Sequence, residues 1–188
     1  MANPLLLRMA PEVLARRKQV IESIDKLSCF GRLSEIVAKD LEALGPGQSP
    51  PDVRGTEVRT WLEFGWADAQ ERWPRVHGKV ATRLPAVCQR CLEPCEIDLD
   101  VAVNLLLVKS RDTRSADDAL EIWELEGSEL LPLDLVEETL VMALPLAPKH
   151  ETLAECGLQV SSQDETAANT QEKIRPFANL KEQLKQPR

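Results

Sequence analysis

The chain has 188 residues, of which 43% are hydrophobic and 29% charged, and its formal net charge is −8. These proportions exclude a chain that is disordered throughout, and the length allows one ordinary domain with extensions. No apolar run reaches the roughly eighteen residues of a transmembrane helix, and residues 1–9 lack the basic lead-in of a signal peptide. We therefore expect a cytoplasmic protein, in which the five cysteines are thiols or metal ligands rather than a disulfide framework.

The first fifty residues predict helices. Residues 11–27 have an apolar stripe at helical spacing and begin with a proline, which favours the first turn of a helix. A second helix is expected from a Ser34 cap to Leu44, and the Gly- and Pro-rich residues 45–51 would end it. The apolar positions of the first predicted helix are Leu14, Ile21 and Ile24. We therefore take residues 1–50 as an N-terminal helical segment.

The middle of the chain changes to a period of two, which is typical of strands with one buried face. The alternation predicts three long strands, at residues 57–66, 75–87 and 96–108, and a shorter strand at residues 120–125. Because we read the connections as short and hairpin-like, we expect the sheet to be antiparallel.

A last helix is predicted from Pro132 to about Leu144, where Pro145 stops it. The fold class that follows is α+β: an antiparallel, barrel-like β-sheet with N-terminal helices and one C-terminal helix. In this division residues 51–156 hold the sheet and helix, and residues 157–188 form a flexible tail with a short docking peptide near residues 175–181.

Cys88 and Cys91 form a Cys-x-x-Cys knuckle between two predicted strands, and His150 and Cys156 follow the last predicted helix. Two thiols on one hairpin tip can hold a metal ion or form a redox disulfide. The distant His and Cys favour the metal, because structural zinc takes four nitrogen or sulfur ligands in a closed tetrahedron. A purely structural knuckle without metal and a redox dithiol remain alternatives. Cys95, before the apolar side of a strand, is expected to be a small buried hydrophobe.

Charge is unevenly distributed. Residues 92–143 carry fourteen Asp or Glu against three Lys or Arg, whereas residues 54–90 carry seven Lys or Arg against four Asp or Glu. We predict RNA phosphate contacts on the basic side, with solubility of an edge strand as the alternative. We predict a basic protein partner on the acidic side, again with solubility as the alternative. The basic candidates are Arg75, Lys79, Arg83 and Arg90, and the acidic ones are Asp98, Asp100, Glu121 and Glu124.

The sequence offers little for catalysis. It has no glycine-rich loop to cradle phosphate, no serine in a nucleophile elbow and only two histidines. We expect a protein that is not an enzyme and has no small-molecule substrate.

Several of these segments together resemble the YceD family, whose members are called large ribosomal RNA subunit accumulation proteins. The resemblance rests on the knuckle from Cys88 to Pro94, on residues 134–138 and 143–150, on Cys156 and on residues 176–180. The family pattern of Cys-x-x-Cys upstream, and Cys or His followed by Cys downstream, matches Cys88, Cys91, His150 and Cys156, a set that would bind Zn²⁺.

The resemblance implies a non-enzymatic ribosome biogenesis factor that acts in the synthesis, processing or stability of 23S rRNA. Its partners would be 23S rRNA or its precursor, a large-subunit ribosomal protein, or both. Two rival functions are an adaptor that binds a basic ribosomal protein without touching RNA, and a thiol oxidoreductase.

Overall fold

The computed structural model describes residues 3–45, 53–109, 121–125 and 127–157, all of which belong to the compact unit Met1–Leu158. Residues 46–51 of the linker predicted at residues 45–51, the tail from residue 158 and its docking peptide lie outside the described residues. The elements in chain order are the short 3₁₀ turn η1 (Pro4–Leu6), α1 (Pro11–Arg16), β1 (Val20–Lys26), η2 (Leu27–Cys29), α2 (Gly31–Leu41), η3 (Val53–Gly55), β2 (Glu57–Trp66), β3 (Pro74–Val87), β4 (Pro94–Lys109), β5 (Glu121–Leu125) and α3 (Pro132–Ala143).

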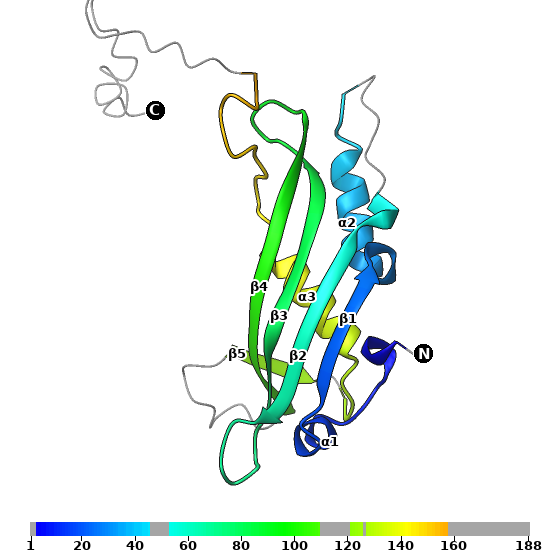
Figure 1. Cartoon of the computed structure of the whole chain (residues 1–188), viewed down its shortest axis with the longest axis vertical. Coiled ribbons are helices and arrows are strands. Elements are labelled where there is room, and N and C mark those ends of the chain that lie inside the picture. The colour runs from blue at the N-terminus through cyan, green and yellow to red at the C-terminus, as the bar shows by residue number, and fades with distance from the viewer. Residues whose placement is uncertain (1–2, 46–52, 110–120, 126, 158–188) are drawn as a thin grey trace, which may run out of the picture. The chain divides into compact units, whose positions relative to one another are not determined.

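The strands form one open five-stranded sheet in the order β1-β2-β3-β4-β5 (Figure 1). The first three pairings are antiparallel, with Ile21 opposite Leu62, Leu62 opposite Gly78 and Val80 opposite Val101. The mixed α+β class is confirmed. The sheet is not closed, because β1 and β5 remain separate edges among the described residues, so the expected barrel is not what this sheet forms.

β5 corrects the expectation of a wholly antiparallel sheet. It runs parallel to β4, in a register that places Leu105 beside Glu121 and Lys109 beside Leu125. A parallel neighbour needs a connection that brings the chain back to the same end of the sheet, which a tight hairpin cannot do. The intervening residues 110–120 lie outside the described part of the chain.

The helix predicted over residues 11–27 is also wrong in its second half. Helix α1 stops at Arg16, Lys18 takes a left-handed φ of 47°, and the chain then extends as β1. Ile21 is buried while Ile24 is 65% exposed, so the two isoleucines do not share the apolar side that a helix would give them. The β-branched residues of this stretch fit a strand paired to β2, and tertiary pairing overrides the helical spacing.

The other helices are close to their predicted positions. Helix α2 begins at Gly31 rather than at Ser34, whose hydroxyl instead donates to the carbonyl of Leu27 at 2.6 Å. Helix α3 begins at Pro132, where the fixed φ of proline suits the first turn and the missing N–H costs nothing.

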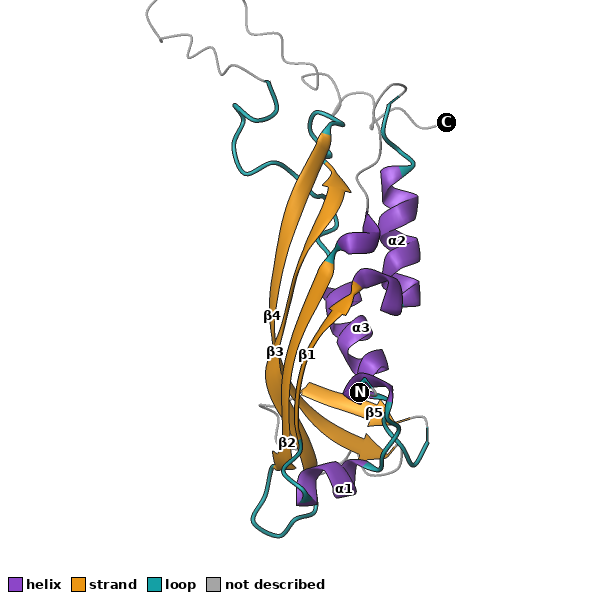
Figure 2. Cartoon of the chain, turned by 45° about the vertical axis from the view of Figure 1, so that its right-hand side comes forward, coloured by secondary structure: helices purple, strands orange, loops and turns teal. Residues whose placement is uncertain are grey.

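Helices α2 and α3 cover one face of the sheet, and the core lies between them (Figure 2). Inward residues of β2 and β3 meet apolar residues of both helices, which have the 3.6-residue spacing of a core-facing stripe. The buried members include Val58, Leu62, Val76, Val80 and Leu84 from the strands, and Leu33, Val37, Leu41, Leu135, Val136 and Leu140 from the helices. No helix in the described segments is long and apolar enough to cross a membrane.

The opposite face of the sheet is polar and no described element covers it. Trp61 packs its ring edge-to-face with His77 there, with centroids 5.7 Å apart. Gly78 of β3 follows His77 and lies on the inner side of the sheet. Glycine is required there because the backbone of β2 comes very close: a Cβ built on Gly78 would lie 2.1 Å from the carbonyl oxygen of Trp61. β2 and β3 can therefore pair as they do only with glycine at this position.

Candidate metal centre

The β3–β4 hairpin ends in a tight turn that presents two thiols. The N–H of Leu92 donates to the carbonyl of Cys88 at 2.8 Å, and the N–H of Cys88 donates to the carbonyl of Glu93 at 2.9 Å. Leu92 closes the turn with a left-handed φ of 61°. This folds residues 88–93 into a knuckle with both cysteines on one side.

The chain after α3 returns to this knuckle. The N–H of Gln89 donates to the carbonyl of Pro148 at 2.8 Å, which ties the proline-rich segment to the hairpin tip. A further turn starts at Thr152, whose hydroxyl accepts from the N–H of Glu155, and it brings Cys156 back toward His150. The five-residue gap between His150 and Cys156 is thus taken up by one compact turn.

The four predicted ligands meet at one point. The Sγ atoms of Cys88, Cys91 and Cys156 and one ring nitrogen of His150 all lie within 4.8 Å of one another. Cys88 Sγ is 3.8 Å from Cys156 Sγ, and His150 Nδ1 is 3.5 Å from Cys91 Sγ and 3.4 Å from Cys156 Sγ. A tetrahedral zinc ion with the usual bond lengths separates two sulfurs by about 3.8 Å and a sulfur from a nitrogen by about 3.5 Å. The group therefore has the spacing of a closed structural zinc site.

His150 is held in one tautomer. Its Nε2 lies 3.1 Å from the carbonyl oxygen of Pro94, which can only accept a hydrogen bond. Nε2 must then carry the proton, and Nδ1, which faces the thiols, is left as a lone-pair donor. A ring N–H bound to a carbonyl is the usual way in which a metal-binding histidine is oriented.

The thiols differ in acidity. Burial raises the pKa of Cys88, but the backbone N–H groups of His150, Cys91 and Arg90 donate to its sulfur and bring the pKa down to about 5. Burial, together with hydrogen bonds that its thiol donates to Cys91 and Cys88, raises the pKa of Cys156. A metal ion would therefore meet the thiolate of Cys88 and the protonated thiol of Cys156, whose proton it would displace on binding.

Cys95 lies next to this group but outside it. Its side chain is 6% exposed and packs in a small cluster with Ala86 and Cys88. Burial, followed by the charge of Cys88, raises the pKa of Cys95 to about 11. The thiol therefore stays protonated at neutral pH and packs as a small apolar side chain.

Two supporting residues were not anticipated from the sequence. Asp40 on α2 accepts a hydrogen bond from the N–H of Val87 at 3.1 Å, directly before the knuckle. Pro94 offers the carbonyl that orients His150. Neither has a sequence signal of its own, since an aspartate on a helix and a carbonyl at a strand start are common, and only the packing of α2 and of the last loop assigns them these contacts.

The four predicted RNA-binding residues do not form a free basic patch. Lys79 pairs with Asp100 at 2.8 Å, and Arg83 pairs with Asp98 through two nitrogens at 2.6 and 3.0 Å. Arg75 donates to the side chain of Asn104, and Arg90 lies in the knuckle with Nη1 3.7 Å from Cys156 Sγ. The antiparallel register sets the basic side chains of β3 beside the acidic ones of β4, so Lys79 and Arg83 share one face with Asp98 and Asp100.

The predicted acidic quartet is also divided. Asp98 and Asp100 point to the uncovered face, together with their basic partners on β3. Glu121 is paired in register with Leu105, which is buried under α3, so Glu121 belongs to the helix-covered side. A sheet alternates its side chains strictly, so these four carboxylates cannot form a single surface.

These features define an α+β protein that carries a Cys₃His group able to hold a metal ion. Residues 76–185 match the family model described as "Large ribosomal RNA subunit accumulation protein YceD", and the chain belongs to this family. A relative of the same name from Haemophilus influenzae is 36% identical over 111 residues, which are 55% of this chain and 61% of the relative. The match thus covers less than two thirds of that relative's length. No solved structure matches the chain.

Proposed function

We propose that this protein is a non-enzymatic, zinc-stabilised factor of the cytoplasm that promotes accumulation of the large ribosomal subunit RNA, 23S rRNA or its precursor. The observation that carries the proposal is membership of the YceD family over residues 76–185, a match that includes all four residues of the Cys₃His group. The family description names accumulation of the large-subunit RNA and no chemical reaction.

The zinc ion, in this proposal, has a structural role. Its four ligands would close the tetrahedron and leave no open position for water or substrate, which separates structural from catalytic zinc sites. The ligands come from the β3–β4 hairpin and from the loop after α3, so the ion would connect two segments about sixty residues apart in sequence. It would fix the end of the sheet that includes Arg90.

In this proposal the RNA contacts are made by Arg75, Lys79, Arg83 and Arg90, and two of these cations must first leave the carboxylates that they already pair with. Lys79 and Arg83 already have carboxylate partners, so binding a phosphate would require exchanging Asp100 and Asp98 for the RNA. Both pairs are exposed, with side chains about 60% accessible, and such pairs are worth little in water. The exchange is therefore inexpensive, and phosphate contact would be strongly salt dependent.

An adaptor for a basic ribosomal protein is the second candidate. It is favoured by the acidity of residues 92–143, a stretch that contains β4, β5 and α3 and includes fourteen carboxylates. Such a protein would promote rRNA accumulation without touching the RNA.

The experiment that tests the proposed function removes the gene from its host and measures the ratio of 23S to 16S rRNA. We expect the ratio to fall, and to recover with the wild-type gene and with Cys95→Ser but not with Cys88→Ser. Affinity capture of the tagged protein, with and without RNase treatment, distinguishes the two candidates. A partner that is still captured after RNase treatment is a protein, as the adaptor candidate expects. A normal rRNA ratio in the deletion strain would contradict the proposal.

A further inference from the structure

β4 has one edge that is largely unpaired. On one side β3 pairs with it from Pro94 to Leu106, whereas on the other side β5 pairs only with Leu105–Lys109. From Cys95 to Asn104 no strand or backbone hydrogen bond in the described segments occupies this second edge. Figure 1 shows β4 extending well past β5 as the outermost long strand. A long open edge presents N–H and C=O groups that can pair with another extended chain.

A groove runs beside this edge, between β4, β5 and α3. It has a volume of about 860 Å³ and is lined by Val101, Ala102 and Leu105 of β4, by residues of β5, and by Thr139 and Met142 of α3. Met142 is 77% exposed and Ile122 is 43% exposed, so two large apolar side chains that line this hollow are left open to solvent. The groove could therefore bury the apolar side chains of a strand laid along β4.

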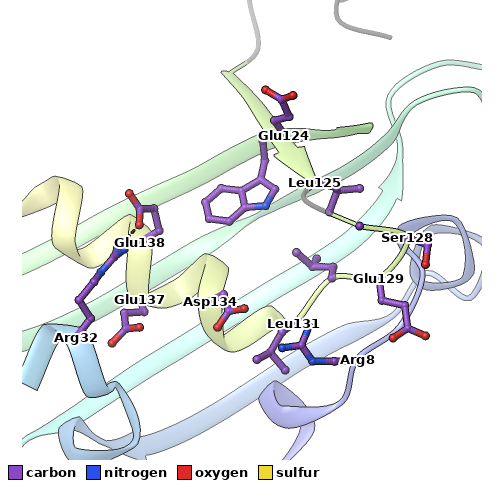
Figure 3. Close-up of a pocket in the computed structure, with 13 residues that line it drawn as sticks. Arg8, Arg32, Glu124, Leu125, Ser128, Glu129, Leu131, Asp134, Glu137 and Glu138 are labelled. Atoms are coloured by element: carbon purple, nitrogen blue, oxygen red, sulfur yellow. Dashed lines mark hydrogen bonds and ion pairs between the residues drawn. The ribbon is translucent and has the colours of Figure 1, made fainter. Parts of the chain in front are cut away.

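The groove continues into a second cavity of about 590 Å³, since Trp123, Glu124 and Glu138 line both. Figure 3 shows this cavity, which is lined by carboxylates from β5, from the segment after β5 and from α3, among them Glu124, Glu129 and Asp134. Arg32 is one of its two arginines and is already paired with Glu138. Carboxylates thus outnumber cations along the whole hollow.

The unpaired edge of β4 is also acidic, like the hollow beside it. Glu96, Asp98 and Asp100 lie between Pro94 and Asn104, and this stretch contains no lysine or arginine. Glu121 and Glu124 at the groove make no ion pair with another described residue. Two copies of this chain meeting edge to edge would bring like charges together, which disfavours self-pairing. Lys79 and Arg83 of β3 already pair with these three carboxylates, so a basic strand would find its opposite charges chiefly at Glu121 and Glu124.

The other edge of the sheet is guarded. β1 directs Asp25 to its inner side, where the side-chain amide of Asn3 donates to the carboxylate. The turn η1 begins directly after Asn3 and places the buried Leu5 against the core. An inward charge and a covering segment are common ways of blocking an edge strand. Within the described parts of the chain, β4 has neither over Cys95–Asn104.

We propose that the free edge of β4 and the adjoining groove, here the β4–α3 groove, dock an extended lysine- or arginine-rich segment of a partner protein. The segment adds to the sheet as a strand beside β4, turns its apolar side chains to the helix-covered side, where Met142 lines the groove, and places the cations of the alternate positions near Glu124 on the opposite face. This inference deepens the adaptor form of the proposed function. Its test uses a synthetic peptide and no RNA, so that a failure of this docking proposal can be distinguished from a failure of the proposed function in rRNA accumulation.

The probe is a fluorescent peptide of about nine residues with alternating Lys and Val, a length that spans the unpaired edge. We expect it to bind the full-length protein and to protect the backbone amides of Glu96–Asn104 from hydrogen exchange. Met142→Arg, at an exposed position, should weaken binding by about tenfold or more, as should Glu121→Lys combined with Glu124→Lys. Ile24→Arg, on β1 and also exposed, is the matched control and should leave binding unchanged.

Two further peptides make the test selective. Replacing the central Val by Pro removes a strand donor and should abolish binding, and replacing every Lys by Glu should do the same. Equal binding of the proline peptide would show charge capture without strand addition and would overturn the proposal. Protection of β1 instead of β4, unchanged affinity in Met142→Arg, no binding of the Lys–Val peptide, or its displacement by an RNA oligonucleotide would overturn it as well.

Discussion

The imidazole of His150 is oriented by Pro94: Nε2 donates to the main-chain carbonyl at 3.1 Å, and Nδ1 then faces Cys91 and Cys156. The two residues lie on different segments, one at the start of β4 and the other in the loop after α3. The same contact that joins these segments also selects the nitrogen that would bind a metal. Folding of the hairpin end and preparation of the ligand set are therefore coupled.

Metal content is the first prediction. Protein purified without chelators should carry about one zinc ion per chain, measured by elemental analysis, because the four ligand atoms have tetrahedral spacing. Chelation should lower the melting temperature by about 8–16 °C, the shift that a ligand at roughly a thousand times its dissociation constant gives to a domain of this size. Cys88→Ser should remove the metal, whereas Cys95→Ser should retain it. Metal-free protein with five freely titratable thiols would contradict the site.

The second prediction concerns pH. In the metal-free protein the pKa of Cys88 is lowered from its ordinary value of 9.0 to about 5. A lowered folded-state pKa contributes stability that is fully present above pH 9 and is lost as the pH falls through 5. In the metal-free protein, thiolate absorbance should therefore show a transition with a midpoint near pH 5, and this transition should be absent from Cys88→Ser. Cys95, with a pKa raised to about 11, should resist alkylation at neutral pH. Titration of all five thiols together near their ordinary pKa would count against the N–H contacts to Cys88.

The third prediction concerns Gly78. Alanine there would place a Cβ 2.1 Å from the carbonyl oxygen of Trp61, so β2 and β3 would have to separate. We expect Gly78→Ala to lower the free energy of unfolding by about 3 kcal/mol or more, measured by urea denaturation. Gly65→Ala is the matched control, since Gly65 is also in β2–β3 pairing and has open space where its Cβ would lie. Equal stability of the two variants would refute the close approach.

The fourth prediction concerns the paired charges of the uncovered face. If Lys79 and Arg83 contact rRNA, Asp98→Asn with Asp100→Asn should strengthen RNA binding, because it removes the closest carboxylate of each cation and leaves Arg83 only its longer contact with Glu96. Lys79→Ala with Arg83→Ala should weaken binding and make it less salt dependent. Neither double variant should change stability by more than about 1 kcal/mol, because the pairs are exposed. RNA affinity that is the same in both double variants would exclude this face.

The fifth prediction concerns Asp40. Its carboxylate holds the N–H of Val87 just before the knuckle, so Asp40→Ala should loosen the hairpin end and weaken zinc binding by about tenfold, measured by competition with a chromogenic chelator. Glu42→Ala, at the end of the same helix, is the control and should bind zinc normally. An unchanged zinc affinity in Asp40→Ala would show that the contact does not support the site.

Sequence reasoning identified what depends on local pattern. The alternation in residues 57–66, 75–87 and 96–108 predicts β2, β3 and β4 to within a few residues, because burying one face of a sheet imposes a period of two. Pro132 and Pro145 bracket α3 for an equally local reason, since proline suits a helix start and cannot continue one. The Cys-x-x-Cys spacing and the downstream His and Cys indicated the four residues that the fold brings together.

What only the tertiary structure decided is pairing between distant segments. Residues 20–26 have a helical spacing that the edge of β2 overrules, and β5 runs parallel to β4, which no local pattern shows. The antiparallel register of β3 and β4 sets Arg83 beside Asp98 and Lys79 beside Asp100. These basic and acidic residues, which sequence reasoning assigned to two separate surfaces, therefore lie on one face of the sheet. A strand's own alternation determines which of its side chains share a face, but the neighbours those side chains meet depend on strand order and register, which long-range packing alone determines.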